Sequence, residues 1–446
     1  MMIFFKELEY MTSLEFEKKL PTKNIDELWA CLIKKNIIKY NNKEQFCFDY
    51  VGIIAWREII ISINPKYTSL GDNKYSSFKT IFKILKKMYL EKSVERNIFV
   101  GSEWAESKKM NSKIYNSILI LEDYISNGIY FEEYKLKIIN GNGAIDWGDT
   151  IDSLDPLVFN GQYIYTEYYT EENMDEEDNF ITKLHYFILN DAIEFLRKKE
   201  IIDILGYEID INLRNIIQIE DFIFCAEILK KELEVQFKDS KINTITYMIN
   251  YLEMKSVSEV DNEMYFYGTR NFKYIWETLC SRVLNNEIKS IEDKYKFETP
   301  KWVIDNKEMY NKRNILKPDI MTMCVYEGKK YLLIFDAKYY CMKYEDDKIS
   351  ANPGISDVTK QYLYETICEK YIKENDIDYI YNIFLFPSEL ETRKVGQVEL
   401  EFMKSVKIKA NQIVLMNIND TEFIEIFSSN KVFNFIKIIK LLKDVR

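Results

Sequence analysis

Two strand-like apolar runs near the C-terminal end of the chain, separated by a single turn, constrain the fold more than any other feature. Residues Ile320–Tyr326 and Tyr331–Asp336 are dominated by apolar and aromatic side chains, as strands are. The dipeptide Glu327-Gly328 between them is typical of a hairpin turn. We therefore predict two paired strands, the second of which is buried.

The segments around this hairpin predict a mixed sheet flanked by helices. Helical periodicity covers Phe272–Leu284, Asp357–Ile372 and Val432–Leu442, and strand-like runs occur at Tyr379–Phe386 and Gln412–Asn417. The order helix, strand, strand, helix, strand indicates an α/β domain. We place this domain at residues 261–446.

The predicted hairpin carries charged residues at one end. The second strand ends in Asp336-Ala337-Lys338, and Asp319 precedes the first strand within the only Pro-Asp dipeptide of the chain. An acid two residues before a lysine is a weak pattern that also occurs at Asp72–Lys74, Glu287–Lys289 and Asp305–Lys307. At Asp336, however, the pattern ends an apolar strand and has another acid nearby. The alternative interpretation is an exposed hairpin end with an ordinary Asp–Lys pair.

These residue types suit metal-dependent hydrolysis of a phosphodiester. Positions i and i+2 of a strand point to the same face, so Asp336 and Lys338 project together. Strand pairing can bring Asp319 beside Asp336, and two such carboxylates repel each other unless a cation lies between them. Mg²⁺, or Mn²⁺ in its place, is the natural cation because it is bound through carboxylates, water and phosphate oxygens. Lys338 can then orient or help deprotonate a metal-bound water, or stabilise negative charge on the phosphate.

The spacing of Asp319, Asp336 and Lys338 resembles that of the PD-(D/E)XK nuclease superfamily. Further segments are similar to the LlaJI-type restriction endonuclease family, which is related to the McrC nuclease subunits. These segments are Tyr50–Ile53, Gly141–Ile151, Asp336–Tyr340 and Pro353–Gln361. The resemblance implies a PD-(D/E)XK nuclease fold at residues 261–446 and a restriction endonuclease activity.

The resemblance also implies roles for individual residues. Asp319, Asp336 and the carbonyl group of Ala337 would ligate the metal, and Lys338 would be the catalytic lysine. Many members of the superfamily place another acid on a helix before the first core strand. Glu277 matches this position as a catalytic and metal-binding residue, although it could equally be a solvent-facing helical Glu.

Two residues at the start of the next helix are further candidates. Gln361 matches a glutamine that related nucleases carry after the site, followed one turn later by a tyrosine. Here the tyrosine is Tyr364, one residue sooner than in those relatives. Lys360 and Gln361 could contact phosphate or a metal-bound water, or they could be simple surface groups.

Charge divides the chain into three segments, which we take as domains. The net charge of −11 separates into +4 for residues 1–140, −15 for residues 141–260 and zero for residues 261–446. We expect residues 1–140, of mixed structure, to recognise DNA or dock a partner. Because the negative excess is confined to the middle segment, the overall charge does not exclude DNA as a partner.

The acidic middle segment is expected to be mainly helical. Helical periodicity covers Ile181–Ile204 and Ile219–Met254. Leu157–Tyr165 is predicted to be a strand and Glu171–Asp178 a mobile acidic loop or linker. The three glycines of Gly141–Ile151, near Trp147, predict a tight turn against which an aromatic ring packs.

Several classes of protein are excluded or disfavoured. The chain has one histidine, His185, within the apolar stretch Leu184–Leu189, so a zinc site of several imidazoles is excluded and a core histidine is expected. Seven scattered cysteines without a CxxC pair predict no disulfide framework. We find no signal-peptide core and no apolar run long enough to cross a membrane, so a cytoplasmic protein without a membrane partner is expected.

No G-x-x-x-x-G-K-[ST] phosphate-binding loop occurs in the sequence, so the chain cannot act as a P-loop NTPase. The resemblance therefore implies a separate AAA-type NTPase subunit and a companion DNA methyltransferase, with a dimer or higher assembly. The leading interpretation is a Mg²⁺-dependent restriction endonuclease that cleaves double-stranded DNA in host defence. The alternatives are a McrC-like nuclease subunit of an NTPase-dependent, modification-dependent complex, and a non-catalytic DNA-binding or assembly subunit.

Overall fold

A computed structural model describes most of the chain. The described residues are 2–21, 25–71, 74–90, 99–100, 113–176, 179–207, 209, 217–257, 264–295, 297, 301–305, 307–310, 316–345, 348–405, 410 and 412–443. They form an α/β structure with several sheets, as predicted. No helix in these ranges is long and apolar enough to cross a membrane.

The chain folds into two compact units whose boundaries differ from the three predicted segments. Unit 1 contains Ala55–Ile59 and Trp104–Tyr267, and unit 2 contains Met2–Ile54, Ile60–Glu103 and Gly268–Arg446. The first hundred residues therefore belong largely with the C-terminal third. Charge could not reveal this, because the grouping comes from contacts between residues far apart in the sequence.

The N-terminal region of the chain is built around a sheet in the order β1-β5-β4-β12-β6, in which β12 comes from later in the sequence. Its strands are β1 (Met2–Lys6), β5 (Ile59–Asn64), β4 (Val51–Trp56), β12 (Met264–Thr269) and β6 (Phe99–Val100). The hairpin β2 (Ile38–Tyr40) and β3 (Phe46–Phe48) and the helices α1 (Ser13–Lys19), α2 (Asp26–Lys34) and α3 (Lys74–Leu90) complete it. Phe5, Phe16, Phe46 and Phe48 form a cluster of touching rings, which supplies much of its core.

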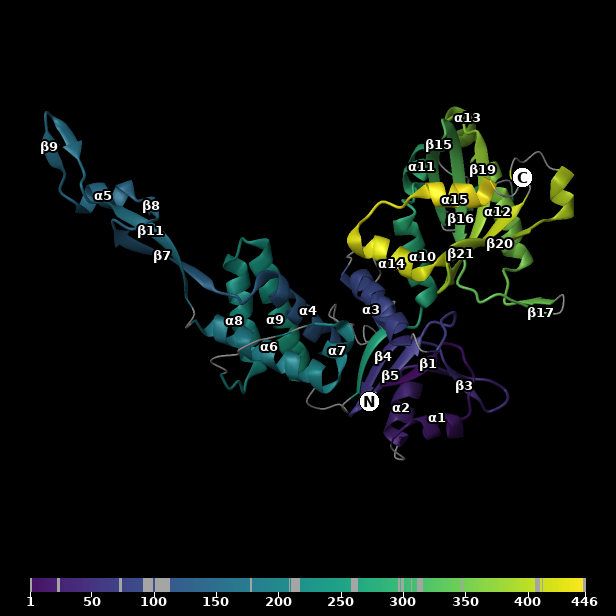
Figure 1. The fold of residues 1–446 in the computed structure, drawn as a ribbon, viewed down its shortest axis with the longest axis horizontal. Coiled ribbons are helices and arrows are strands. Elements are labelled where there is room, and N and C mark those ends of the chain that lie inside the picture. The colour runs from purple at the N-terminus through teal and green to yellow at the C-terminus, as the bar shows by residue number, and fades with distance from the viewer. Residues whose placement is uncertain are drawn as a thin grey trace. The chain divides into compact units, whose positions relative to one another are not determined.

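The C-terminal part of unit 2 contains the predicted mixed sheet, in the order β15-β16-β19-β21-β20 (Figure 1). Its strands are β15 (Ile320–Tyr326), β16 (Lys329–Ala337), β19 (Tyr379–Ser388), β21 (Ile413–Asn419) and β20 (Arg393–Val398). The two outer pairs are antiparallel, whereas β16, β19 and β21 run parallel. The hairpin and the strands β19 and β21 are as predicted, whereas β20 was not predicted.

Helices cover this sheet and bury its apolar side chains. They are α10 (Phe272–Val283), α11 (Ile288–Tyr295), α12 (Ile355–Ile367), α13 (Glu369–Glu374), α14 (Asp420–Ser429) and α15 (Phe435–Lys443). Met321, Leu332 and Ile334 pack in one cluster with residues of α11, α12 and α13. Two small hairpins, β13 (Lys301–Ile304) with β14 (Lys307–Tyr310) and β17 (Lys343–Glu345) with β18 (Lys348–Ser350), lie outside the sheet.

Unit 1 contains a helical core made of α4 (Lys113–Asn127), α6 (Phe180–Lys198), α7 (Ile201–Leu205), α8 (Phe222–Val235) and α9 (Asp239–Val257). Each of the two long predicted helices is divided into two. His185 is fully buried, its Nδ1 accepts a hydrogen bond from the Tyr130 N–H (3.0 Å), and burial lowers its pKa to about 4. The predicted core histidine is confirmed.

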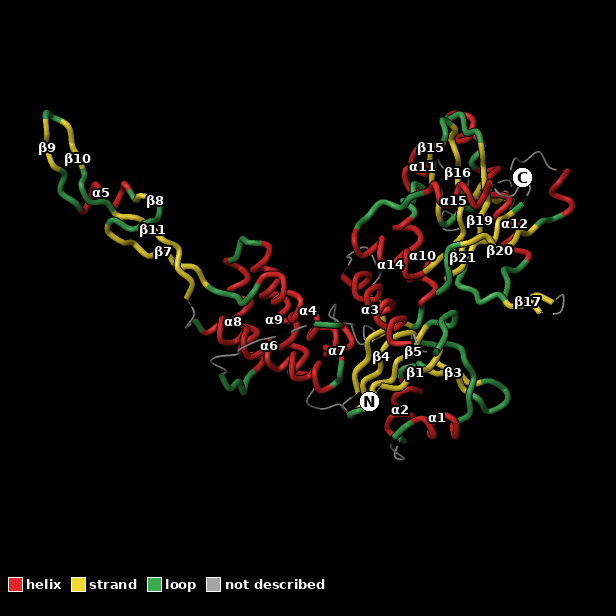
Figure 2. The backbone as a smooth tube through the Cα atoms, in the orientation of Figure 1, coloured by secondary structure: helices red, strands yellow, loops and turns green. Residues whose placement is uncertain are grey.

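Unit 1 also contains a strand-rich part that the sequence analysis described incorrectly. Glu171–Glu176 is not a loop but part of strand β11 (Tyr169–Glu176), which pairs with β7 (Glu132–Ile139) and β8 (Ala144–Ile145); Glu177 and Asp178 lie outside the described residues. Leu157–Tyr165 is not one strand but a hairpin of β9 (Leu157–Phe159) and β10 (Gln162–Ile164) (Figure 2).

The expected packing role of Trp147 is also wrong. This residue begins α5 (Trp147–Ser153), and its side chain is 54% exposed, with one edge contact to Tyr165. The helix is fixed by Asp146 instead, whose carboxylate caps it by accepting a hydrogen bond from the Asp149 N–H (3.1 Å). The aromatic ring is therefore a surface group.

Candidate active site

The hairpin of β15 and β16 places the predicted acids opposite each other. Ile320 pairs with Phe335 in antiparallel register, so Asp319, one residue earlier, lies across from Asp336. The Lys338 N–H donates to the Leu385 carbonyl of β19 (2.8 Å), which fixes the end of β16 against the neighbouring strand. Asp336 is only 4% exposed and Lys338 only 8%. An exposed hairpin end, the alternative interpretation, is therefore wrong.

The Asp336 carboxylate acts strongly on Asp319. The pKa of Asp319 is raised to about 8, first because the group is buried and next because the Asp336 carboxylate is adjacent. Glu277 adds to this effect, whereas Lys338 opposes it. A proton or a metal cation bound between the two acids would relieve the repulsion.

Asp319 is positioned by a side chain that the sequence analysis did not identify. The Asn286 side-chain Nδ2 donates to the Asp319 carbonyl (2.8 Å), and its Oδ1 accepts from the Met321 N–H (3.0 Å). The amide therefore holds the backbone on both sides of Ile320, at the point where β15 begins. A lone asparagine in a turn gives no sequence signal for such a role.

Lys338 lies between two acids. Its Nζ is 2.9 Å from Asp336 Oδ2 and 2.9 Å from Asp357 Oδ1. Burial acts to lower the pKa of Lys338, but the attraction of both carboxylates outweighs it, and the pKa is raised. The side chain is therefore a cation at neutral pH.

Asp357 is the second functional residue that the sequence analysis missed. It lies in the first turn of α12, where its other oxygen accepts a hydrogen bond from the Gly354 N–H (3.3 Å). An acid at the third helical position is a capping signal that can be read from the sequence. Its contact with Lys338, in contrast, depends on how α12 packs on the sheet.

Glu277 lies on α10 and is half-buried. Burial raises the pKa of its carboxyl, Lys273 opposes this rise, and repulsion from Asp336 adds to it, so the group is electrostatically part of the site. Across the described ranges, however, no three His, Cys, Asp or Glu side chains are close enough to hold one metal ion. In this conformation Glu277 therefore does not join Asp319 and Asp336 as a third ligand.

The two candidates on α12 differ in their surroundings. Gln361 is fully buried, and its Nε2 donates to the Ile334 carbonyl of β16 (3.0 Å). It therefore supports the catalytic strand and is not exposed for direct contact with phosphate. Lys360 is exposed. Tyr364 is buried. Its pKa is raised, chiefly by burial and next by the negative charge of Asp336.

The residues present fit a hard divalent cation. Asp319 and Asp336 offer carboxylate oxygens, and the Ala337 carbonyl lies in the same short segment. Oxygen donors of this kind suit Mg²⁺ or Mn²⁺ and not the softer metals that prefer thiolate or imidazole. Burial and the neighbouring Asp336 raise the pKa of Asp319, and a cation between the two acids would oppose this rise.

Comparisons with known proteins identify relatives of this chain. The sequence model of the LlaJI restriction endonuclease family matches residues 50–421. The type II restriction enzyme BsuMI component YdjA of Bacillus subtilis strain 168 is 27% identical over 425 residues, which cover 93% of this chain and 88% of that protein.

Among solved structures, the chain is similar to a chain of a Thermococcus gammatolerans assembly of McrB AAA+ hexamers with bound McrC. The match has 14% sequence identity and a TM-score of 0.38, and it covers 96% of this chain and 99% of that one. A chain of the McrBC complex of the same organism matches with 13% identity and a TM-score of 0.25, over 57% and 80%. Because the family match spans most of the sequence, including both acids and the lysine, the chain belongs to the LlaJI restriction endonuclease family.

Proposed function

We propose that this chain is the nuclease subunit of a restriction system and hydrolyses phosphodiester bonds of double-stranded DNA with Mg²⁺. The observation that carries the proposal is the convergence of Asp319, Asp336 and Lys338 at one buried strand end. Family membership supports nuclease activity, and the acid pair supports the requirement for a cation.

The residues of the site would divide the work as follows. Asp319 and Asp336, with the Ala337 carbonyl, would hold the metal. When bound, Mg²⁺ polarises the phosphate and makes a bound water more acidic. The charged Lys338 would stabilise the negative charge that develops on the phosphate. Its raised pKa favours this role over that of a base that removes a proton from water.

We further propose that the chain acts with an AAA-type NTPase subunit and a companion DNA methyltransferase. The chain has no P-loop of its own, and its Bacillus subtilis relative is named a component of a restriction enzyme. These facts also favour the second candidate function, a McrC-like nuclease subunit that cleaves only when its NTPase is active.

Plasmid cleavage by the purified full chain tests the site. In Mg²⁺, Lys338→Ala and Asp336→Asn should each reduce the cleavage rate by at least about a hundredfold, because the first removes the cation that would stabilise the phosphate and the second removes a metal-binding charge. Lys307→Ala is the matched control: this lysine follows an acid at the same spacing but lies on an exposed hairpin. Equal cleavage by Lys338→Ala and the control would refute the assignment.

Adding the partner separates the two candidate functions. Cleavage by the chain alone without nucleotide supports an autonomous endonuclease. Cleavage only after addition of the NTPase subunit and nucleotide supports the McrC-like subunit. If both conditions fail in Mg²⁺ and Mn²⁺, and Lys338→Ala leaves the restriction phenotype of cells unchanged, the chain is a non-catalytic subunit.

A further inference from the structure

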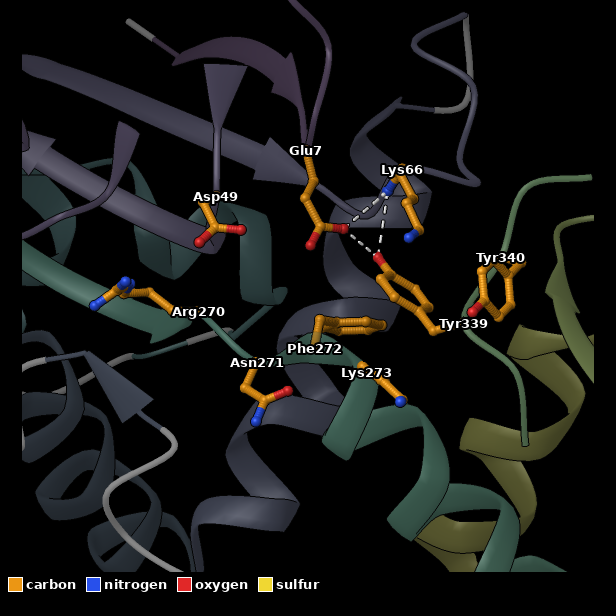
Figure 3. Close-up of a pocket in the computed structure, with 9 residues that line it drawn as sticks. All are labelled: Glu7, Asp49, Lys66, Arg270, Asn271, Phe272, Lys273, Tyr339 and Tyr340. Carbon is orange, nitrogen blue, oxygen red and sulfur yellow. Dashed lines mark hydrogen bonds between the residues drawn. The ribbon is translucent and has the colours of Figure 1, made fainter. Parts of the chain in front are cut away.

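Figure 3 shows a pocket of about 270 Å³ in unit 2, part of whose lining directly follows the candidate active-site residue Lys338 in the chain. Tyr339 and Tyr340, which directly follow the catalytic lysine, form one side of it. Phe272 and Lys273, at the start of α10, form another. Pockets that hold small ligands typically measure ~300–1,000 Å³, so this one suits a group no larger than about one nucleotide.

The pocket is lined by three basic side chains, Lys66, Arg270 and Lys273. They come from three places in the sequence, namely the segment after β5, the end of β12 and the first turn of α10. Three cations around one small pocket favour an anionic ligand.

The two acids that line the pocket are already engaged. Glu7 accepts hydrogen bonds from the Tyr339 hydroxyl and from the Lys66 N–H (3.3 Å), and burial raises its pKa. Asp49 forms an ion pair with Lys39, with 2.7 Å between Nζ and Oδ2. The lining still carries more basic than acidic side chains, three against two.

Aromatic rings accompany the cations. The Lys66 Nζ lies 4.4 Å from the centre of the Tyr339 ring and 5.9 Å from that of Tyr340, and the Tyr339 ring also packs on Phe272. Tyr340 is only partly buried, so part of its surface is available to a ligand. Basic groups beside aromatic rings are the combination that binds single nucleotides of a strand. The cations bind the phosphate, and the base stacks on the ring.

Helix α10 connects this pocket with the active site. Lys273 and Glu277 are four residues apart and so lie on the same side of the helix. The charge of Lys273 also acts on the pKa of Glu277, which confirms their proximity. Asn271 at the N-cap makes no capping hydrogen bond with its side chain, and a helix N-terminus of this kind attracts anions.

We propose that this pocket binds one nucleotide of the DNA strand next to the scissile phosphate, with its backbone phosphate on Lys66 and Lys273 and its base against Tyr340. The inference rests on the proposed nuclease function. It adds a site that holds the strand beside the metal-binding acids.

The salt dependence of DNA binding tests the phosphate interaction. The full chain is titrated with a fluorescent duplex of about 30 bp in Ca²⁺, at NaCl concentrations from about 50 to 200 mM. The double variant Lys66→Ala/Lys273→Ala should lower the slope of log K against log[NaCl] by about 0.9 for each phosphate that the variant no longer binds. The control Lys307→Ala/Lys440→Ala removes the same charge from exposed positions on β14 and α15, and should keep the wild-type slope.

A second pair of variants tests the ring. Tyr340→Ala should weaken binding of the duplex by about 5- to 100-fold because the base can no longer stack, and Tyr340→Phe should retain the affinity. Lys273→Ala alone truncates an exposed side chain and provides a variant whose fold is unaffected, as circular dichroism would verify.

The outcomes separate this inference from the proposed function. If the pocket variants bind with the wild-type slope while the wild-type chain cleaves DNA, the pocket inference is wrong and the nuclease stands. If the wild-type chain neither binds nor cleaves the duplex, either alone or with the NTPase subunit and nucleotide, both are wrong. If free deoxyadenosine monophosphate binds the wild-type chain at micromolar concentration, the pocket holds a free nucleotide and not a nucleotide of the strand.

Discussion

Two hairpins of this protein have the same turn but opposite environments. In β15–β16 the turn is Glu327-Gly328, with φ of 51° and 72°, and in β9–β10 it is Asn160-Gly161, with φ of 51° and 78°. Positive φ at both central residues is the turn that suits the twist of paired strands. Yet β16 is buried from Tyr331 to Ala337, whereas every residue of β9 and β10 is exposed.

The difference shows that turn chemistry and apolar composition specify a hairpin but not its burial. Leu157, Val158 and Phe159 are as apolar as the residues of β16, but they belong to a two-stranded sheet with no covering layer. Strand β16 is covered because β15 and β19 flank it and helices pack on its sheet. A buried strand end can hold acids at high pKa, and an exposed one cannot.

The largest effect on stability should come from the buried hairpin. Leu333→Ala in β16 should lower the free energy of unfolding by about 2–5 kcal/mol, because it leaves a cavity in a packed sheet. Val158→Ala in β9 should change it by no more than about 0.5 kcal/mol. Urea unfolding of both variants measures this contrast. A similar loss at both positions would mean that β9 is covered in solution.

The next effect should appear in catalysis. Asp357→Ala removes one of the two acids that hold Lys338, so cleavage should fall by about 10- to 100-fold while DNA affinity is kept. Asp357→Asn, which can still accept hydrogen bonds from Gly354 and from Lys338, should restore part of the rate. Single-turnover cleavage and duplex binding distinguish the two effects, and a loss confined to binding would contradict a positioning role.

The smallest expected effect is the dependence of stability on pH, which reports the free-energy cost of burying the two acids. The folded pKa of Asp319, about 8, exceeds the ~3.9 expected in the unfolded chain, so the unfolded state loses its proton first. Stability should therefore fall as pH rises from about 4 to 8 and level off above that.

Asp319→Asn should remove this dependence of stability on pH. In the metal-free protein, the gain in the free energy of unfolding should be larger at pH 8 than at pH 5, by on the order of 1–3 kcal/mol. Urea unfolding in EDTA at the two pH values measures the difference. Mg²⁺ should raise the melting temperature of the wild-type chain but not that of the variant. A variant less stable than the wild type at pH 8 in EDTA would refute the repulsion between the acids.

The sequence alone determined the hairpin that carries the candidate site. The apolar runs, the Glu-Gly turn and the i, i+2 spacing are local properties, and they place Asp319, Asp336 and Lys338 together through strand register. The same local reasoning was wrong for Glu171–Glu176, because backbone pairing with β7 can hold a strand of acidic residues that the side-chain pattern does not indicate. It was also wrong for Trp147, since the sequence does not show whether a ring has a surface to pack against.

Only the tertiary structure decided which residues from elsewhere join the hairpin. Asp357 reaches Lys338, Asn286 holds Asp319, and Glu7 contacts Tyr339 from more than three hundred positions away in the chain. The same packing groups the first hundred residues largely with the last third and forms the basic, aromatic pocket. Such contacts depend on how whole helices and strands pack together. Hydrophobic burial fixes that packing without regard to the separation of residues along the chain, so no local sequence pattern encodes the contacts.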